Sequence, residues 1–323
     1  MKAFVTGGTG FIGSHLVDRL LKNQNNDIHC LVRTDDKWLH DKDFIKVKGT
    51  LHDLPALQKG MEGADVVYHI AGVVKAPEQH IFDSANVEAT ENVLRLAMKL
   101  KVPKLIILSS LAACGPSFKR PLVEQDPLMP ITMYGESKKR MEEMVNRVAG
   151  DTISVTLIRP PAVYGPRENQ IFSVFQLASY HLFPIIGDGI STKVSLIHVK
   201  DLVEGTLLAA EKQKPGVETF FISSEVLYTW EEIRHTVETV FGHKLHSIRI
   251  KPRLVEQVGL IAEKAASLIG RYPVINRDKA KELGMQWTCS VDKAKKQLDF
   301  RQKTNLLDGL TETITWYKRH HWL

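Results

Sequence analysis

Cysteine is scarce in this sequence, and long apolar runs are absent from it. The 323 residues include three cysteines, Cys30, Cys114 and Cys289, which are odd in number and far apart. This count and spacing exclude a disulfide framework and indicate no metal site, so reduced thiols are expected. No stretch reaches the roughly 20 apolar residues of a membrane-spanning helix. An apolar run begins already at Lys2, which leaves no room for a signal peptide, so we expect a cytoplasmic protein without a transmembrane segment.

A strong excess of charge of either sign is also missing. The formal net charge is +6, and the basic residues are scattered apart from short clusters at 138–140 and 318–321. Dedicated nucleic-acid-binding proteins carry a denser basic stripe, so no nucleic-acid partner is expected. Apolar residues make up 43% of the chain and charged residues 25%, which is typical of globular proteins. A chain of this length can bury a large core and corresponds to about two domains.

Short apolar runs alternate with helix-like stretches in the first half of the chain. The runs lie at 2–6, 28–32, 44–47, 65–70, 104–108 and 155–158. This alternation indicates a parallel sheet with helices on both faces. After Pro160 the pattern becomes irregular, but runs at 195–199 and 219–223 flank a helix and suggest one more strand–helix–strand step. We predict an α/β, doubly wound domain over 1–165 and 195–224, and a smaller, mostly helical substrate-binding lobe over 166–194 and 225–323.

A glycine-rich loop directly follows the first predicted strand. Gly7, Gly10 and Gly13 have the spacing G-x-x-G-x-x-G at the point where strand gives way to helix. Glycine there permits a tight turn, close approach of a pyrophosphate to the backbone, and close packing of helix on strand. The N-terminus of the helix supplies free N–H groups for phosphates. The context favours a Rossmann dinucleotide site over a glycine-rich turn without function, and its predicted cofactor contacts are Gly7, Thr9, Gly10, Phe11, Ile12 and Gly13.

The residue after the second strand predicts which dinucleotide is bound. An acidic side chain at this position would accept hydrogen bonds from the ribose 2′-hydroxyl of NAD, whereas an arginine would pair with the 2′-phosphate of NADP. The chain has Arg33 there, and no carboxylate precedes Asp35. Arg33 therefore favours NADP(H). NAD stays open, because Arg33 could be a solvated surface residue and Asp35 or Asp36 could turn toward the ribose.

Tyr134 and Lys138 are four residues apart and would share one face of a helix. A tyrosine with its ordinary pKa of about 10 is a poor base at neutral pH. A nearby ammonium and an oxidised nicotinamide favour the phenolate, which would let Tyr134 exchange a proton with an alcohol or ketone. Ser110, just after the run at 104–108, is placed where a parallel sheet presents ligand-contacting residues. Each of these residues taken singly is also compatible with an ordinary helix surface.

Together these motifs closely resemble the extended short-chain dehydrogenase/reductases. This superfamily includes nucleotide-sugar epimerases and dehydratases, 3β-hydroxysteroid dehydrogenases and dihydroflavonol reductases, and the resemblance covers essentially the whole chain. It implies that Ser110, Tyr134 and Lys138 form the catalytic set and that Lys138 also binds the nicotinamide ribose. It further implies a cofactor site lined by Thr50, Leu51, Ala71, Gly72, Asn86, Pro161 and Val163. One departure is Thr50, because family members commonly carry an aspartate there at the adenine site.

Other departures distinguish the branches of the family. Nucleotide-sugar dehydratases of this superfamily resemble one another in placing acidic residues directly after the catalytic Ser or Thr. Leu111 and Ala112 here can transfer no proton, so a dehydratase is not expected. Nucleotide-sugar enzymes tend to grip the substrate diphosphate with an asparagine at the position of Ala162. They often add an arginine where this chain has Lys193, which lacks the bidentate fork. These differences, together with the segment 276–290, place the chain nearer to the steroid dehydrogenases and dihydroflavonol reductases.

Apolar residues stand in place of those polar anchors. They occur in a helical stripe over 254–269 and at Phe172, Val174, Phe175, Leu177, Tyr180, Leu182 and Phe183. This pattern is compatible with a pocket for a hydrophobic substrate, and equally with the core of the smaller lobe. Docking of the stripe on a membrane surface is a less favoured alternative, because its charges are mixed.

We therefore predict an NADP(H)-dependent oxidoreductase that interconverts a secondary alcohol and a ketone or aldehyde of a small apolar substrate. Tyr134 would act as the general acid/base. A nucleotide-sugar 4-epimerase with tightly bound NAD is the alternative. A non-catalytic NADP(H)-sensing protein is a third hypothesis, which the intact Ser/Tyr/Lys set argues against. A homodimer is compatible with the resemblance, because family members often pair two helices beside the tyrosine helix.

Overall fold

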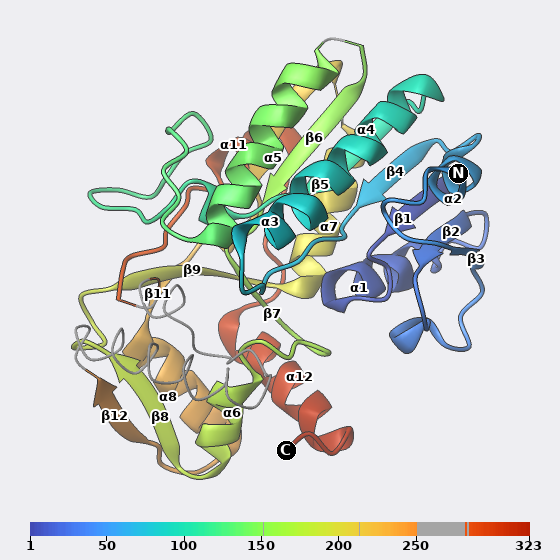
Figure 1. Ribbon diagram of the computed structural model, residues 1–323. Coiled ribbons are helices and arrows are strands. Elements are labelled where there is room, and N and C mark those ends of the chain that lie inside the picture. Colours follow the sequence, from blue (N-terminus) through green and yellow to red (C-terminus); the bar gives the residue numbers. More distant parts are fainter. Residues whose placement is uncertain (151, 213, 251–281, 283) are drawn as a thin grey trace.

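A seven-stranded parallel sheet forms the centre of the computed structural model, which describes residues 1–150, 152–212, 214–250, 282 and 284–323. Helices cover both faces of this sheet, and a smaller lobe packs beside it (Figure 1). The strand order is β10-β6-β5-β4-β1-β2-β3. The strands are β1 Lys2–Thr6, β2 Asp27–Val32, β3 Ile45–Lys48, β4 Val66–His69, β5 Lys104–Leu108, β6 Ser154–Arg159 and β10 Gly216–Phe221. The predicted doubly wound α/β fold is confirmed.

Alternate residues along the strands fill two separate cores, one on each face of the sheet. In β1, Ala3 and Val5 belong to one core and Phe4 belongs to the other. Because side chains alternate between the two faces, a strand that is buried on both faces appears in the sequence as a continuous apolar run. The first core is closed by α1 (Phe11–Leu20), α7 (Val199–Glu211) and α11 (Asp292–Leu298), and the second by α2 (Leu54–Met61), α4 (Ala89–Lys99) and α5 (Met133–Ala149).

The direction of strand addition reverses between β1 and β4. The chain adds β2 and β3 on one side of β1 and then returns to pair β4 with the other side. The carboxyl ends of β1 and β4 therefore flank a crevice, which is where open α/β sheets bind ligands. Because β5 and β6 run parallel to β4, the segments that follow them reach the same edge of the sheet. The predicted site residues that come just after a strand, from Gly7 after β1 to Ser110 after β5, thus lie at this edge.

The smaller lobe combines helices with two short sheets. One sheet has the order β11-β9-β7, and the other pairs β12 with β8. Its described elements are β7 Ala162–Tyr164, α6 Phe172–Ser179, β8 Leu182–Ile186, β9 Lys193–His198, β11 Leu227–Thr229, α8 Trp230–Phe241, β12 His246–Ile250 and α12 Leu306–Arg319. The prediction that the run at 195–199 joins the central sheet was wrong, because β9 pairs with β7 and β11 instead. The run at 219–223 does join it, as β10 beside β6.

The core of the smaller lobe absorbs much of the apolar segment 172–183. Phe175 and Phe183 are fully buried there, with Phe172 and Val174 packed against them, whereas Tyr180 remains exposed. The segment therefore contributes mainly to packing, which is one of the two roles expected for it. The helical stripe at 254–269 lies outside the described residues. None of the described helices is both long and apolar enough to cross a membrane.

Leu57 offers a test of the packing of α2 on the sheet. Its side chain is fully buried in the second core. We expect Leu57→Ala to lower the free energy of unfolding by about 2–5 kcal/mol, because it removes apolar contacts and leaves a cavity. Urea unfolding would measure this loss, and the m-value should not change. Lys59→Ala, at an exposed position of the same helix, should change the free energy by no more than about 0.5 kcal/mol.

Candidate functional site

The glycine loop after β1 lies against the segment that follows β4. Gly7 adopts φ +73°, and a Cβ on it would lie 2.6 Å from the backbone nitrogen of Ala71. A Cβ on Gly13 would lie 2.1 Å from the carbonyl oxygen of Gly7. Neither position tolerates a side chain, so the backbone of the loop folds back tightly onto the start of α1. The tight turn that the spacing predicts is present, and its contact with a phosphate stays a prediction.

The N-terminus of α1 leaves its first amides available to a ligand. Gly10 is the N-cap residue, no side chain caps it, and the first turn contains no acidic residue. An uncapped helix N-terminus with its positive dipole end favours phosphate oxygens. Thr9, Phe11 and Ile12 are half-buried around this point. The residues present therefore fit the pyrophosphate of a dinucleotide.

Arg33 is exposed directly after β2, where it could contact the adenosine ribose of a bound dinucleotide. Among the described residues it forms no ion pair, and it remains available to an anion. Asp36 is bound instead to the Lys46 ammonium at 3.3 Å, and hydrogen bonding to its own backbone lowers the pKa of this carboxyl. Thr50 is exposed after β3, and its hydroxyl accepts a hydrogen bond from the backbone nitrogen of His52. Beside it, Leu51 is half-buried.

Ser110 and Tyr134 meet in the crevice, although 24 residues of chain separate them. Ser110 caps a short turn, Leu111–Ala113, and accepts a hydrogen bond from the backbone nitrogen of Ala112 at 3.1 Å. Tyr134 is the second residue of α5, and its phenol is hydrogen-bonded to the Ser110 hydroxyl. Burial raises the pKa of Tyr134 to about 12, while the bond to Ser110 acts in the opposite direction. The group is therefore a phenol at neutral pH, able to donate a proton.

A close contact of backbone and helix makes this meeting possible. A Cβ on Gly135 would lie 2.4 Å from the carbonyl oxygen of Ala112, so only glycine lets the 111–113 turn approach α5 so closely. Thr132 fixes the start of the helix by accepting a hydrogen bond from the Gly135 nitrogen at 3.1 Å. In the sequence this contact is indicated by the glycine directly after the tyrosine. The Y-x-x-x-K pattern alone does not include that glycine.

Lys138 is buried one turn after Tyr134. Its ammonium donates to the carbonyl oxygen of Leu108 at 2.8 Å, and it lies beside Gly72, where a Cβ would be 3.3 Å from Nζ. Burial lowers the pKa of Lys138 to about 8, and the carboxylate of Glu142 opposes this by raising it. The cation is thus held between the ends of β4 and β5, on the same side as the predicted cofactor.

Asn86 holds the loop after β4 against α5. It is buried in a π-helical turn, Asp83–Glu88, that joins the short helix α3 (Gln79–Phe82) to α4. Its side chain accepts from the backbone nitrogen of Val73 at 2.8 Å and donates to the Val73 carbonyl and to Ser137 Oγ at 2.9 and 3.0 Å. Turns of this kind are frequent at functional sites. Asn86 thereby fixes Ala71 and Gly72 at the crevice, whereas Pro161 is buried just after β6 and Val163, in β7, packs against the first core.

Two buried polar groups near the site carry no predicted role. His69 Nδ1 accepts from the Thr6 hydroxyl at 2.7 Å, and His69 Nε2 donates to Thr90, whose own hydroxyl donates to the Asn86 carbonyl. Burial lowers the pKa of His69 to about 3, so the ring is neutral. The other group is the ion pair of Glu142 with Arg159, and Glu142 follows Lys138 by one helical turn. Helical spacing in the sequence could have identified Glu142 as a neighbour of Lys138.

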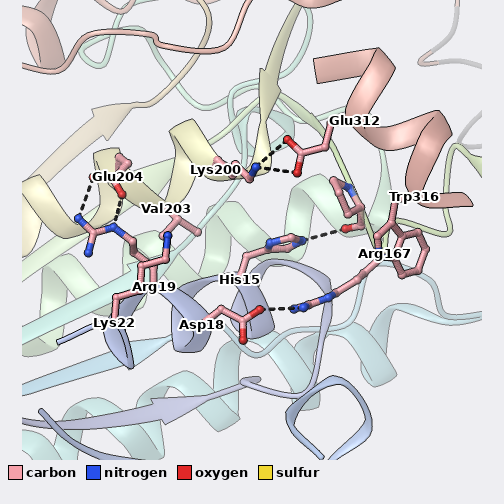
Figure 2. A pocket seen from close by; sticks show the side chains of 11 residues that line it. His15, Asp18, Arg19, Lys22, Arg167, Lys200, Val203, Glu204, Glu312 and Trp316 are labelled. Carbon is pink, nitrogen blue, oxygen red and sulfur yellow. Dashed lines mark hydrogen bonds and ion pairs between the residues drawn. The ribbon is translucent and has the colours of Figure 1, made fainter. Parts of the chain in front are cut away.

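A cavity of about 360 Å³ lies apart from these residues, between α1, α7 and α12 (Figure 2). Ion pairs join its walls, among them Arg167–Asp18 at 2.7 Å and Lys200–Glu312 at 2.6 Å. Its lining includes neither the glycine loop nor Ser110, Tyr134 or Lys138. Its three carboxylates are all paired with cations of the lining, and the residues predicted to bind cofactor and substrate lie elsewhere, so we take the crevice as the candidate site.

Comparison with known proteins agrees with this geometry. A family model described as the NAD dependent epimerase/dehydratase family matches residues 3–222. The chain belongs to this family. It is 30% identical to a ceramide reductase of Caulobacter vibrioides, over 99% of this chain and 95% of the relative. It is 27% identical to a 4-hydroxy-2-methyl-3-oxo-4-farnesyl-3,4-dihydroquinoline-1-oxide ketoreductase of Stigmatella aurantiaca, over 96% of this chain and 95% of that one.

Solved structures share the same fold. A UDP-glucuronic acid 4-epimerase from Bacillus cereus, in complex with UDP-glucuronic acid and NAD, has a TM-score of 0.81 to this chain. Its sequence is 21% identical, and the match covers 99% of this chain and all of that one. The likeness extends over both lobes. It establishes the architecture, whereas the reaction has to be argued from the residues of the crevice.

Gly13 provides a test of the phosphate cradle. We expect Gly13→Ala to weaken binding of NADPH or NADH by at least about tenfold, because the added Cβ displaces the loop that would hold the pyrophosphate. Quenching or enhancement of nicotinamide fluorescence would measure the dissociation constants. Lys22→Ala, just beyond the other end of α1, is the matched control and should bind as wild type. Unchanged affinity in Gly13→Ala would contradict the placement of the dinucleotide at this loop.

Proposed function

We propose that the protein is an NADP(H)-dependent oxidoreductase that interconverts a secondary alcohol and a ketone or aldehyde. The observation that carries this proposal is the meeting of Ser110, Tyr134 and Lys138 at the crevice between β1 and β4. The turn after Ser110 presents Leu111 and Ala112, both buried and without a titratable group. Proton transfer in the site therefore rests on Tyr134, as one hydride transfer coupled to one proton transfer requires.

In the reductive direction the residues would act on the carbonyl oxygen of the substrate. Nicotinamide supplies the hydride for the carbonyl carbon when the cofactor is bound. Tyr134 donates its phenolic proton to the carbonyl oxygen, and Ser110 donates a hydrogen bond to the same oxygen. The Lys138 ammonium stabilises the phenolate that remains until it regains a proton from solvent. The products are the alcohol and the oxidised cofactor, and alcohol oxidation follows the same steps in reverse.

An apolar substrate fits the residues better than a nucleotide sugar does. Ala162 is an exposed alanine in β7, and Lys193 is an exposed lysine at the start of β9, so two anchors for a diphosphate are missing or weakened. Two relatives bear names that describe a ceramide and a farnesylated quinoline as substrates. Both compounds are large and apolar. We infer a hydrophobic carbonyl compound or alcohol as the substrate class.

Tyr134→Phe tests the assignment of the general acid/base. With NADPH and a panel of hydrophobic ketones, we expect kcat to fall by about 100-fold or more while NADPH affinity stays within about twofold, because only proton transfer is removed. Loss of NADPH absorbance measures turnover, and nicotinamide fluorescence measures binding. Tyr180→Phe, at an exposed tyrosine, should behave as wild type. A Tyr134→Phe enzyme with wild-type turnover, or a wild-type protein stabilised by UDP-sugars instead of reducing ketones, would refute the proposal.

Arg33→Ala tests the choice of cofactor. If the guanidinium faces the 2′-phosphate, NADPH affinity should fall about tenfold, since a charge-assisted pair of this kind contributes about 1.4 kcal/mol. NADH affinity should not change, because NADH lacks that phosphate. Titrations of both cofactors against wild type and variant, with Lys59→Ala as a control for lost surface charge, make the comparison. Equal losses for the two cofactors would show that Arg33 does not discriminate between them.

A further inference from the structure

A buried ion pair lies directly behind the Ser/Tyr/Lys set. Arg159 at the end of β6 donates to Glu142 of α5 through Nη2 at 2.5 Å and through Nε at 3.0 and 3.1 Å. Both side chains are almost fully inaccessible, with 6% of Arg159 and 1% of Glu142 exposed. The hydroxyl of Ser109 donates to the same carboxylate. A carboxylate buried this completely is retained only when hydrogen bonds and an opposite charge satisfy it. Here Arg159 of β6 and Ser109 after β5 supply them.

The carboxylate also determines which way the segment after β5 faces. Successive residues of an extended chain point to opposite sides. Glu142 binds the Ser109 side chain on one side, which leaves Ser110 to face Tyr134 on the other. The backbone is held at the same place, because Ser109 N donates to the carbonyl of Ile158 at 2.7 Å and the Leu108 carbonyl accepts from Lys138. The contacts of Glu142 therefore align the hydroxyl predicted to bind substrate.

The carboxylate of Glu142 also raises the pKa of Lys138, against the effect of burial, although the two side chains form no ion pair. The two residues are one helical turn apart on α5, and both are buried. The other titratable groups around Lys138 are Tyr134, one turn earlier on the same helix, and His69 at the end of β4, which is neutral. Asn86 and the Leu108 carbonyl approach from the remaining sides without charge. Among the described residues, Glu142 is the carboxylate that favours the charged form of Lys138, whereas the carboxylate of Glu282 acts on Tyr134.

We propose that Glu142 is a positioning residue of the reaction, held by Arg159 and Ser109, which aligns Ser110 and keeps the Lys138 ammonium charged in its buried position. The proposal rests on the function proposed above, because it takes Ser110, Tyr134 and Lys138 as the catalytic set. Its distinctive consequence concerns the pH range in which the site works. An ammonium that has lost its counter-anion gives up its proton at lower pH.

The test uses NADPH binding and needs no substrate. NADPH affinity is titrated by nicotinamide fluorescence from neutral to alkaline pH in the wild-type protein, where it should be lost as Lys138 gives up its proton. Lys138→Met should lack this alkaline transition, which assigns it to Lys138. In Glu142→Gln we expect the midpoint of the transition to fall by about one pH unit, since a neutral amide no longer stabilises the ammonium. A midpoint equal to that of wild type would overturn the proposal.

Further variants separate the charge from its surroundings. Glu143→Gln, at an exposed position next along the same helix, should leave the midpoint unchanged. Ser109→Ala retains the carboxylate and should also leave it unchanged, whereas a general loosening of the site would move it. If Glu142→Gln fails to fold because Arg159 is left unpaired, Glu142→Gln/Arg159→Gln is compared with Arg159→Gln, so that both proteins lack the guanidinium and differ only in the carboxylate. The midpoint of the double variant should then lie about one pH unit below that of Arg159→Gln, and equal midpoints would count against Glu142.

Failure of this proposal is distinguishable from failure of the proposed function. If wild type reduces ketones and Tyr134→Phe does not, but Glu142→Gln keeps the wild-type midpoint, only the role of Glu142 is refuted. If the midpoint falls in Glu142→Gln while no ketone is reduced, the charge relation holds and the reaction has been misassigned. In the active enzyme, Ser109→Ala should lower kcat several-fold with NADPH affinity unchanged, because Ser110 loses its alignment.

Discussion

The reversal of strand order between β1 and β4 is the constraint on which the rest of the site depends. It opens a crevice at one edge of the sheet and at the same time forces two backbone segments together, since Gly7 and Ala71 approach so closely that no side chain fits between them. The glycine loop can then turn the N-terminus of α1 toward the crevice. Because the strands are parallel, the ends of β5 and β6 reach the same edge, and α5 lies across them. Residues far apart in the sequence meet here through topology alone.

A second requirement follows from burial. The proposed reaction needs a positive charge near the phenol of Tyr134, but burial disfavours the ammonium of Lys138 and the phenolate of Tyr134 alike. The structure offsets this cost with polar contacts from several elements. Leu108 offers a carbonyl, Ser110 a hydroxyl and Glu142 a carboxylate, and Arg159 in turn compensates the buried carboxylate. Two groups of polar contacts thus lie side by side on α5, one around Tyr134 and Lys138 and the other around Glu142 and the end of β6.

Much of this could be predicted from the sequence because the signals are local. The apolar runs mark strands buried on both faces, and the glycine spacing and the four-residue interval from Tyr134 to Lys138 follow from backbone and helix geometry. Which strands pair with one another, in contrast, depends on residues far apart in the sequence. The run at 195–199 is as apolar as its neighbours, yet β9 joins β7, whose path is set by the chain after Pro161. The bonds of Glu142 to Arg159 and Ser109 span 17 and 33 residues, so the periodicity of α5 could suggest the carboxylate but not its partners.

The apolar residues of the site narrow its chemistry as much as the polar ones do. Leu111 and Ala112 belong to the turn that brings Ser110 to Tyr134, and both become buried where the turn rests on Gly135. A carboxylate in either place would have to be desolvated against the backbone of α5, at a cost that a second proton-transfer group would need to justify. The contact that brings Ser110 to Tyr134 therefore also places two side chains without a titratable group beside them, which is the arrangement that the proposed reaction requires.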